Sequence, residues 1–280
     1  MKTAIHLFFL ATLISLSTCA QPSKPGATNA GLKLPAGFAA LKAADGLGEA
    51  RHIAIASNGD IFVKLSKLKN GKGIYLLHDA NKDGRTEQIT GFGNYTGTGM
   101  YLKDGYLYAS SDEEIFRYKL DADNKPVDEN NPEKIITGLI ARNEHEAKAI
   151  TLDNDGNIYV NIGAYSNSCQ QQDRATGSMG IQPCPVLDSA AGIWQFKIDK
   201  PNQTYGDGVH CATGLRNVVG MDWNTQTNSL FVMQHGRDQL HDIFPDMFTD
   251  KQSAELPAEC MYDLHKGSNC GWPYMYYDQI

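Results

Sequence analysis

The sequence lacks several features that mark common functional classes. It has no run of five or more basic residues, and 25 Lys and Arg against 32 Asp and Glu give the 280-residue chain a net charge of −7. A nucleic-acid partner or an anionic membrane surface is therefore disfavoured. Beyond the N-terminal leader no stretch approaches the roughly 18 apolar residues of a membrane-spanning helix. Helical periodicity is almost absent too, which points away from α-helical folds.

The N-terminus has the pattern of an export signal. A basic start, an apolar run from Leu7 to Leu16 and a small-residue exit predict a signal peptide over residues 1–20. Residues 21–33 are polar and contain Pro and Gly, as expected of a flexible tether. Two processing outcomes stay open, cleavage before Gln21 or lipidation of Cys19 in a lipobox-like segment. Cleavage predicts a periplasmic protein of a bacterium, and lipidation predicts an outer-membrane lipoprotein whose lipid anchor is its one membrane contact.

The cysteines beyond the leader form no CxxC pair, which argues against a tetrahedral zinc site. In an exported protein they are better explained as disulfide partners. Cys169 and Cys184 flank a polar loop that is rich in Gly and Pro, and their pairing is favoured. Cys260 with Cys270 is a weaker candidate, which leaves Cys211 as the odd cysteine.

One pattern recurs along residues 34–280, the expected folded domain. It consists of an apolar pair, a turn and an alternating strand, and its copies are Ile53–Val63, Met100–Ala109, Ala149–Val160 and Val219–Val232. Three copies contain an Asn-Gly or Asp-Gly dipeptide, a strong signal for a two-residue hairpin turn. A further strand follows most copies, at residues 73–77, 114–118 and 192–196.

Short strands that repeat with a period of about 45 residues predict an all-β fold, a β-propeller. A sandwich of unrelated hairpins is the alternative. Four copies and a further start at Cys270–Pro273 predict about four to five blades, and the chain stops without a closing strand, so an incomplete propeller is favoured over a small complete one. The equivalent strands are expected at Ile61–Val63, Tyr106–Ala109, Ile158–Val160 and Leu230–Val232.

Two segments that precede inner strands carry candidate chemistry, because such loops project into the central mouth of a propeller. His145 lies between Glu144 and Glu146, and a neutral His there could serve as a base. Nearby acids raise its pKa and nearby cations lower it, so the sign of the shift stays open. Arg216 occupies the equivalent position before the fourth copy, where a guanidinium suits a carboxylate or a developing oxyanion. The alternatives are a solvated charged turn around His145 and an ion pair between blades for Arg216.

A third segment, His235–Asp242, follows the inner hairpin of the fourth copy. Asp238, Asp242 and loop carbonyls there could bind a hard cation such as calcium. Asp79–Gly84 also looks like the start of a calcium loop. Thr90 stands where that loop needs Glu, so a turn is expected instead.

Together these segments resemble the glucose/sorbosone dehydrogenase family, whose members are soluble six-bladed propellers that oxidise sugars with pyrroloquinoline quinone (PQQ). The likeness begins at about Leu34 and is closer to the L-sorbosone dehydrogenase branch than to the glucose branch. It implies an oxidoreductase that acts on an aldose or a related sugar-derived alcohol or aldehyde and passes electrons to a cytochrome or another acceptor. The matching stretches are residues 214–223, 235–240, 244–249 and 270–274.

The resemblance implies a role for each matching residue. His145 matches the family's base, which takes the hydroxyl proton as hydride leaves carbon for the quinone. Arg216 matches the arginine beside the quinone oxygens. Glu144 and Asn217 match cofactor contacts, and Lys148 stands where many relatives carry an arginine that contacts the cofactor.

The resemblance also places a calcium ion. Gly236 and Arg237 match positions whose main-chain carbonyls hold the cofactor's Ca²⁺, with Asp238 beside them. The chain departs from the family at Val219, where the glucose branch often has a polar cofactor contact. Two other functions stay open: a calcium-dependent propeller lactonase, and a non-catalytic surface module that kept the fold.

Overall fold

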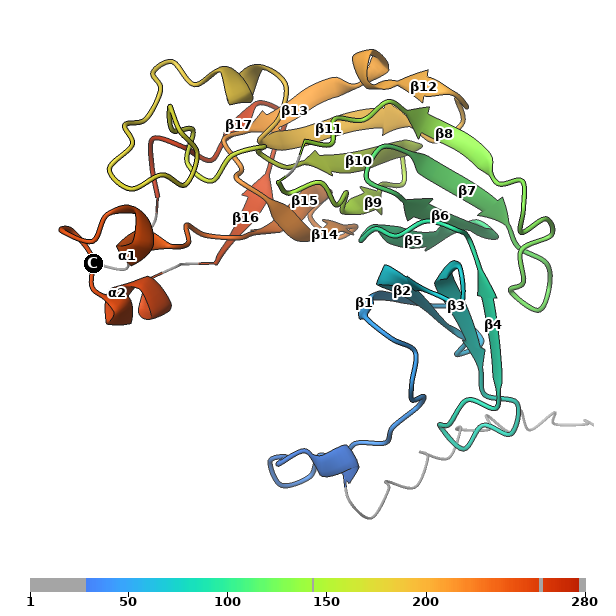
Figure 1. Ribbon diagram of the computed structural model, residues 1–280. Coiled ribbons are helices and arrows are strands. Elements are labelled where there is room, and N and C mark those ends of the chain that lie inside the picture. The colour runs from blue at the N-terminus through green and yellow to red at the C-terminus, as the bar shows by residue number, and fades with distance from the viewer. Residues whose placement is uncertain (1–28, 143, 257–258, 277–280) are drawn as a thin grey trace, which may run out of the picture.

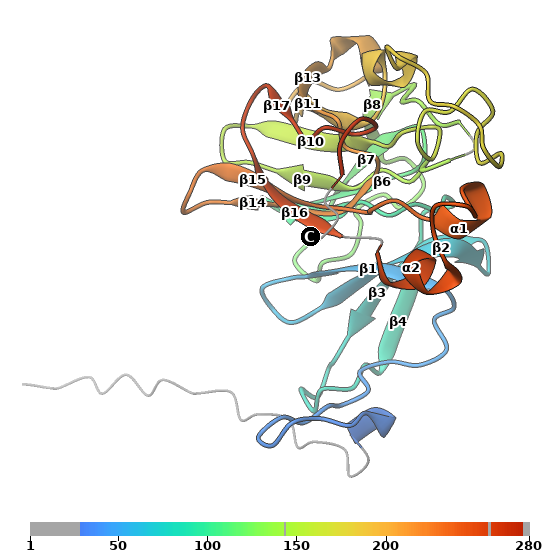
Figure 2. The same cartoon turned by 90° about the vertical axis from the view of Figure 1, so that its left-hand side faces the viewer.

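The structure is a computed structural model that describes residues 29–142, 144–256 and 259–276. Its strands form four sheets that follow one another around an arc, from the blue N-terminal sheet to the red C-terminal one (Figure 1). In the perpendicular view the first sheet lies below the other three, which overlap (Figure 2). The predicted all-β propeller architecture is therefore confirmed, with four blades in the described part of the chain.

Each blade is built from strands that are mostly consecutive in the sequence. The first blade contains β1 (Ala50–Ile55), β2 (Ile61–Lys69), β3 (Lys72–His78) and β4 (Gln88–Phe92). The second contains β5 (Met100–Lys103), β6 (Tyr106–Ser110), β7 (Ile115–Lys119), β8 (Glu133–Thr137) and, at its outer edge, β12 (Gln203–Thr204). The third contains β9 (Ile150–Leu152), β10 (Asn157–Ile162), β11 (Gly192–Lys197), β13 (Val209–Thr213) and β17 (Ser268–Asn269). The fourth contains β14 (Val218–Asn224), β15 (Ser229–Gln234) and β16 (Cys260–Leu264).

The four strands that were expected to be equivalent occupy equivalent positions in their blades. They fall within β2, β6, β10 and β15, which are each the second strand of their own blade. The first strands are neighbours in space, because β1 contacts β5, β5 contacts β9 and β9 contacts β14. The repeat in the sequence thus becomes a radial array with its first strands innermost.

The segment at Cys270 does not begin a fifth sheet in the described residues. Ser268 and Asn269 form β17, which pairs in parallel with β13 of the third blade. Trp272 is buried, and its indole Nε1 donates a hydrogen bond to the main-chain oxygen of Asn167 at 3.1 Å. This part of the chain therefore returns to the third blade.

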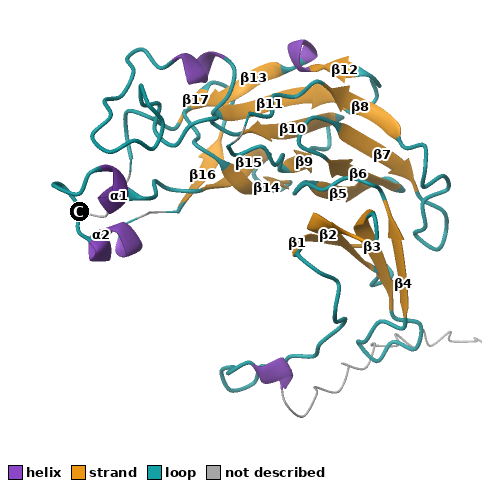
Figure 3. Cartoon of the chain, in the orientation of Figure 1, coloured by secondary structure: helices purple, strands orange, loops and turns teal. Residues whose placement is uncertain are grey.

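Helices are few and short (Figure 3). The sequence analysis missed two that separate β15 from β16, and the local signal for the second is a capping box in which Thr249 and Gln252 exchange hydrogen bonds. None of the helices in the described ranges has the length and apolar character needed to cross a membrane. The helices are α1 (Leu240–Ile243), α2 (Asp250–Glu255) and the 3-10 turns η1 (Asn29–Gly31), η2 (Pro185–Asp188) and η3 (Tyr205–Asp207).

The core lies between successive blades. Phe62 and Phe92 of the first blade pack with Leu107 of the second, and all three are fully buried. A larger cluster joins the second blade to the third, and another joins the third to the fourth. Each sheet is therefore stabilised by burying its faces against its neighbours, as in repeat architectures.

Several expectations fall outside the described residues. The signal peptide at 1–20, the lipidation of Cys19 and most of the tether at 21–33 all lie before Asn29, where the description begins. They stay predictions, as does the incomplete propeller.

We expect Phe62→Ala to lower the free energy of unfolding by about 3–5 kcal/mol, because it opens a cavity between the first two blades. Phe62 is fully buried and packs edge-on against Phe92, with ring centroids 6.4 Å apart. Urea unfolding followed by tryptophan fluorescence measures the change. Phe38→Ala is the matched control, because Phe38 is 71% exposed and should lose little. Equal losses in both variants would contradict the inter-blade core.

Candidate active site

The predicted site residues lie on loops that meet at one end of the arc. Val160 in β10 pairs with Ile150 in β9, and Gln234 in β15 pairs with Val218 in β14, so each inner strand begins beside the end of the second strand. The loops that enter a first strand and leave a second strand therefore share this end. We call the meeting place of the loops at 144–148, 163–191, 214–217 and 235–239 the mouth.

His145 is fixed at the mouth by the end of β10. Its Nδ1 lies 2.5 Å from the main-chain oxygen of Ala164. A carbonyl can only accept, so Nδ1 carries the proton and Nε2 of the neutral ring is free to accept one. His145 has a φ of 49°, and a Cβ on Gly163 would lie 2.6 Å from the Cβ of His145, so this approach requires glycine.

The same peptide connects His145 to Arg216. The N–H of Ala164 donates to the main-chain oxygen of Arg216 at 2.8 Å, while its carbonyl accepts from His145. The structure thus brings together the two residues that equivalent sequence positions had predicted to share the mouth.

The pKa of His145 is lowered below its usual value near 6.5. Burial is the largest cause, since it disfavours the charged ring. Among charged neighbours, Arg216 and Arg174 lower the pKa and Glu144 raises it. The direction that the sequence left open is therefore downward, which keeps the ring neutral at pH 7.

Arg216 is 3% exposed and held on several sides. Its Nε donates to the main-chain oxygen of Asn167 at 3.1 Å and to the side-chain oxygen of Asn167 at 3.0 Å. Nη2 lies 3.0 Å from Oδ2 of Asp238, with which it forms an ion pair. Burial lowers the pKa of Arg216 and Asp238 raises it. A guanidinium nevertheless stays charged at any working pH.

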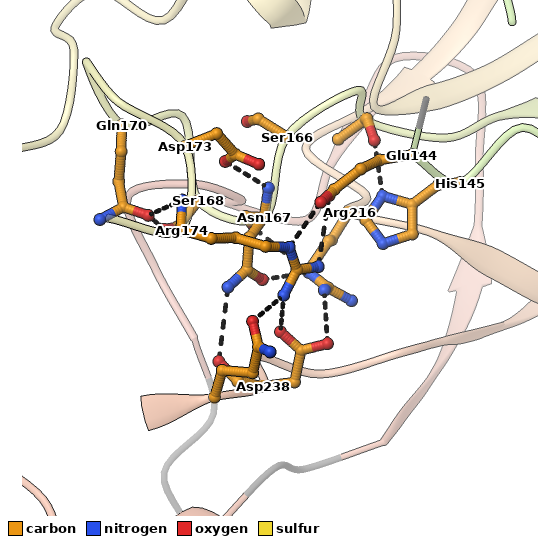
Figure 4. Close-up of polar contacts among 12 residues, drawn as sticks. Glu144, His145, Ser166, Asn167, Ser168, Gln170, Asp173, Arg174, Arg216 and Asp238 are labelled. Atoms are coloured by element: carbon orange, nitrogen blue, oxygen red, sulfur yellow. Dashed lines mark hydrogen bonds and ion pairs between the residues drawn. The ribbon is translucent and has the colours of Figure 1, made fainter. Parts of the chain in front are cut away.

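Arg174, which the sequence analysis missed, connects two predicted segments (Figure 4). Its Nε lies 2.5 Å from Oε1 of Glu144 and its Nη2 lies 3.3 Å from Oε2, a bidentate pair. Nη1 donates to Oδ1 of Asp238 at 3.0 Å and also to Gln239. The bond to Glu144 is the main cause that raises the pKa of Arg174.

Arg174 sits on the loop that the predicted Cys169–Cys184 disulfide closes, and this disulfide is confirmed. The side-chain oxygen of Gln170 accepts from the N–H of Arg174 at 3.2 Å, which shapes the loop around the arginine. The weaker candidate, a disulfide between Cys260 and Cys270, is not formed.

Two other residues that were predicted to contact the cofactor form hydrogen bonds within the protein. Asn217 is buried, and its side-chain oxygen accepts a hydrogen bond from Asn161 of β10 at 3.3 Å. Lys148 is fully buried and its ammonium donates to the main-chain oxygen of Glu146. Burial lowers the pKa of Lys148 to about 8, partly offset by the charge of Asp112. The assigned cofactor roles of Asn217 and Lys148 stay predictions.

The predicted calcium segment lines a cavity of about 280 Å³ beside Arg216. Gly236, Arg237 and Asp238 form part of its wall, together with aromatic side chains including Phe244 and Trp272. Both carboxylate oxygens of Asp238 face guanidinium groups, so they are engaged in this structure. The calcium role of residues 236–238 stays a prediction.

The loop at Asp79–Gly84 has the contacts of the expected turn. The carboxylate of Asp79 accepts from the N–H groups of Asp83 at 3.2 Å and Gly84 at 2.7 Å. Asp79, Asp83 and Glu87 lie near enough to one another to share an ion, but they are mostly exposed and belong to the first blade, away from the mouth.

The topology of the propeller indicated in part that Arg174 lies at the mouth. The loop at 163–191 leaves a second strand, so it had to lie at the same end as the loops that enter first strands. No periodic pattern shows which of its side chains turns inward, and Arg174 follows several polar residues in a row. The sequence could therefore place this loop at the mouth without singling out Arg174.

We expect His145 to titrate below pH 6.5 in the folded protein, because burial disfavours the imidazolium. The ring should stay neutral, with the proton on Nδ1, as the pH falls from 8 through about 6.5, where a free histidine becomes charged. Proton–nitrogen NMR of the ring nitrogens measures the midpoint, and the same protein unfolded in urea gives the reference. A folded midpoint at or above the unfolded one would show that the nearby carboxylates outweigh burial.

Removing the Cys169–Cys184 disulfide by a double Cys→Ser substitution should cost about 3 kcal/mol of unfolding free energy, because a loop with a sequence separation of 15 regains its freedom in the unfolded chain. Urea unfolding measures the loss. The double Cys→Ser variant at 260 and 270 is the control and should lose less, since it removes no cross-link. Equal losses would contradict the prediction.

None of the curated proteins matches the sequence. Among solved structures, the calcium structure of the Trichoderma reesei carbohydrate-active enzyme of family AA12 is 18% identical, with a TM-score of 0.63, over 82% of this chain and 57% of that one. The holo PQQ domain of pyranose dehydrogenase from Coprinopsis cinerea is 18% identical, with a TM-score of 0.57, over 80% of this chain and 52% of that one.

PQQ-bound aldose sugar dehydrogenase from Streptomyces coelicolor is 19% identical, with a TM-score of 0.52, over 85% of this chain and 66% of that one. At such identities the likeness shows the propeller fold, and this chain spans 52–66% of the length of the three structures. The resemblance that the sequence motifs carried is confirmed by the family model, which these structures support at the level of the fold. The model of the TrAA12-like family matches residues 32–276, and the chain belongs to this family.

Proposed function

We propose that this protein is an exported sugar dehydrogenase that oxidises an aldose or a related sugar-derived alcohol or aldehyde with PQQ as oxidant. The observation that carries the proposal is the joint fixation of His145 and Arg216 by Ala164. It holds the ring with its proton on Nδ1 and connects it to the main chain of Arg216, whose charge lowers the pKa of the ring. A base next to an electrostatic stabiliser suits the removal of a hydroxyl proton.

The residues present fit an anionic, planar group. Arg216 and Arg237 both line the cavity, and Nε of Arg237 is buried without a hydrogen-bond partner among the described residues, so the cavity wall offers positive charge to an anion. Arg216 would hold the quinone, with Glu144, Lys148 and Asn217 as further predicted contacts. When bound, PQQ would supply the two-electron acceptor for the hydride that leaves the sugar carbon.

The chain's own residues would handle the proton and the charge. Nε2 of His145 would accept the hydroxyl proton, while the bond from Nδ1 to Ala164 keeps the ring in the correct tautomer. Arg216 would stabilise negative charge that develops nearby, and its burial strengthens this effect because few waters compete. Arg174 binds Glu144 and so keeps that carboxylate from competing for the proton.

The main-chain carbonyls of Gly236 and Arg237, beside Asp238, would hold the cofactor's Ca²⁺. The natural electron acceptor would be a cytochrome or another redox partner. We place the protein in the periplasm or on the outer membrane, with any membrane contact through a lipid on Cys19, and with no nucleic-acid partner.

A calcium-dependent lactonase is supported less well. Such an enzyme needs free carboxylates around one ion, whereas Glu144 and Asp238 at the mouth are both held by Arg174. The arrangement offers guanidinium donors, which suits an anionic cofactor better than a central cation.

We expect the wild-type protein to bind PQQ in the presence of Ca²⁺ and to reduce a dye with an aldose. His145→Ala should lower kcat at least about 100-fold, since a general base contributes that much or more, while the Kd for PQQ stays nearly unchanged. Arg216→Lys should weaken PQQ binding and lower kcat/KM, because an ammonium cannot reproduce the guanidinium fork. Absorbance titration and dye reduction across an aldose panel measure both quantities.

The controls are His265→Ala and Arg85→Lys, which change exposed residues away from the mouth and should leave both quantities unchanged. Calcium binding without PQQ binding would favour the hydrolase, and binding of neither would favour a non-catalytic module. Wild-type turnover in His145→Ala would end the assignment of His145 as base.

A further inference from the structure

The carboxylate of Asp238 is bound in the structure as a ligand would be. Nη1 of Arg174 lies 3.0 Å from Oδ1, and Nη2 of Arg216 lies 3.0 Å from Oδ2, so each oxygen faces a different guanidinium (Figure 4). The two arginines come from separate loops, the disulfide loop and the loop before β14. Two converging guanidiniums are a common arrangement for recognising carboxylates.

Arg216 needs an anion at this position. Its side chain is 4% exposed, and a charge that is buried to this extent is costly unless it is paired. Glu144 forms a bidentate pair with Arg174 and therefore balances the charge of Arg174. Asp238 is thus the carboxylate that neutralises Arg216 in this structure.

Asp238 itself is half-exposed. Its side chain is 47% exposed, and residues 235–239 have no regular secondary structure. A half-exposed carboxylate can return to water at little cost, whereas the buried guanidinium cannot.

We propose that Arg174 and Arg216 form a carboxylate-binding site, that Asp238 fills it as an internal ligand, and that a carboxylate of an incoming molecule exchanges with Asp238. The exchange replaces one negative charge by another, so Arg216 is never left unpaired.

The surroundings indicate what the incoming molecule carries besides its carboxylate. The adjoining cavity of about 280 Å³ is lined by Phe244 and Trp272 and by Arg237, whose guanidinium carbon lies 3.5 Å from the centre of the Tyr276 ring. A ring-sized body that carries a carboxylate fits this combination. Where the proposed function holds, the carboxylate is one of those on PQQ or belongs to a sugar acid, the product class of aldose oxidation.

Titration calorimetry with sodium gluconate and, separately, with PQQ tests the exchange. Asp238→Asn removes the internal ligand and keeps its shape, so the Kd for at least one of the two probes should fall about tenfold or more. Arg174→Gln should weaken binding of that probe. Asp246→Asn is the matched control, because it removes the same charge from an exposed residue of a neighbouring loop and should leave Kd unchanged. Glucose, which has the sugar body without the carboxylate, should show no difference between wild type and Asp238→Asn.

The two arms separate the sources of the carboxylate. Tighter gluconate binding alone assigns the site to a sugar acid, and tighter PQQ binding alone assigns it to the cofactor. Equal Kd values in wild type and Asp238→Asn for both probes would overturn the exchange, and so would an equal gain in Asp246→Asn. The proposed function can fail independently, because gluconate binding needs no quinone and no turnover.

If Asp238→Asn does not fold, the wild-type protein still gives a decisive measurement. Gluconate, but not glucose, should shift the Nη–H resonances of Arg174 and Arg216 in proton–nitrogen NMR, because Nη1 of Arg174 and Nη2 of Arg216 change partner. Unchanged resonances at saturating gluconate and at saturating PQQ would overturn the proposal.

Discussion

The guanidinium of Arg216 is charged at any working pH and its side chain is 4% exposed, so the surrounding chain must supply its hydrogen-bond acceptors and its counter-charge. Asn167 supplies two oxygens and Asp238 supplies the charge. Arg174 then holds Asp238 from the other side. Asn167 and Arg174 both lie on the 163–191 loop, which the disulfide constrains. The disulfide therefore helps to hold the groups around the charge of Arg216 as well as the fold.

The same constraint governs the acid–base properties of the mouth. Two guanidiniums near His145 favour its neutral form, and burial acts in the same direction. Ala164 connects the ring to the peptide of Arg216, so the base cannot move independently of the charge that it works beside. Tautomer, pKa and position of the base thus all follow from how the end of β10 meets the loop before β14.

The sequence predicted the parts of this arrangement that repetition controls. Equivalent positions in successive repeats become neighbours around an axis, and this is why His145 and Arg216 could be placed together although 71 residues separate them. Arg174 follows no repeat, and its inward position depends on contacts within an irregular loop. The sequence analysis missed the helices between β15 and β16 for a related reason, because they form an insertion outside the repeating strand pattern. The return of Ser268 and Asn269 to the third blade depends on pairing across distant sequence, which no local pattern encodes.

Two buried lysines meet the problem of buried charge in another way. Lys64 and Lys148 are both fully buried, and burial lowers the pKa of Lys64 to about 7 and that of Lys148 to about 8. The ammonium of Lys64 lies 3.7 Å from the centre of the Tyr95 ring and donates to the main-chain oxygen of Tyr95, and Asp112 favours the charged form of both lysines. A lysine can lose its proton when it is buried, which lowers the cost of placing Lys64 and Lys148 in the interior. Arg216 has no such option. The carboxylate that balances its charge must therefore come from Asp238 or from a ligand.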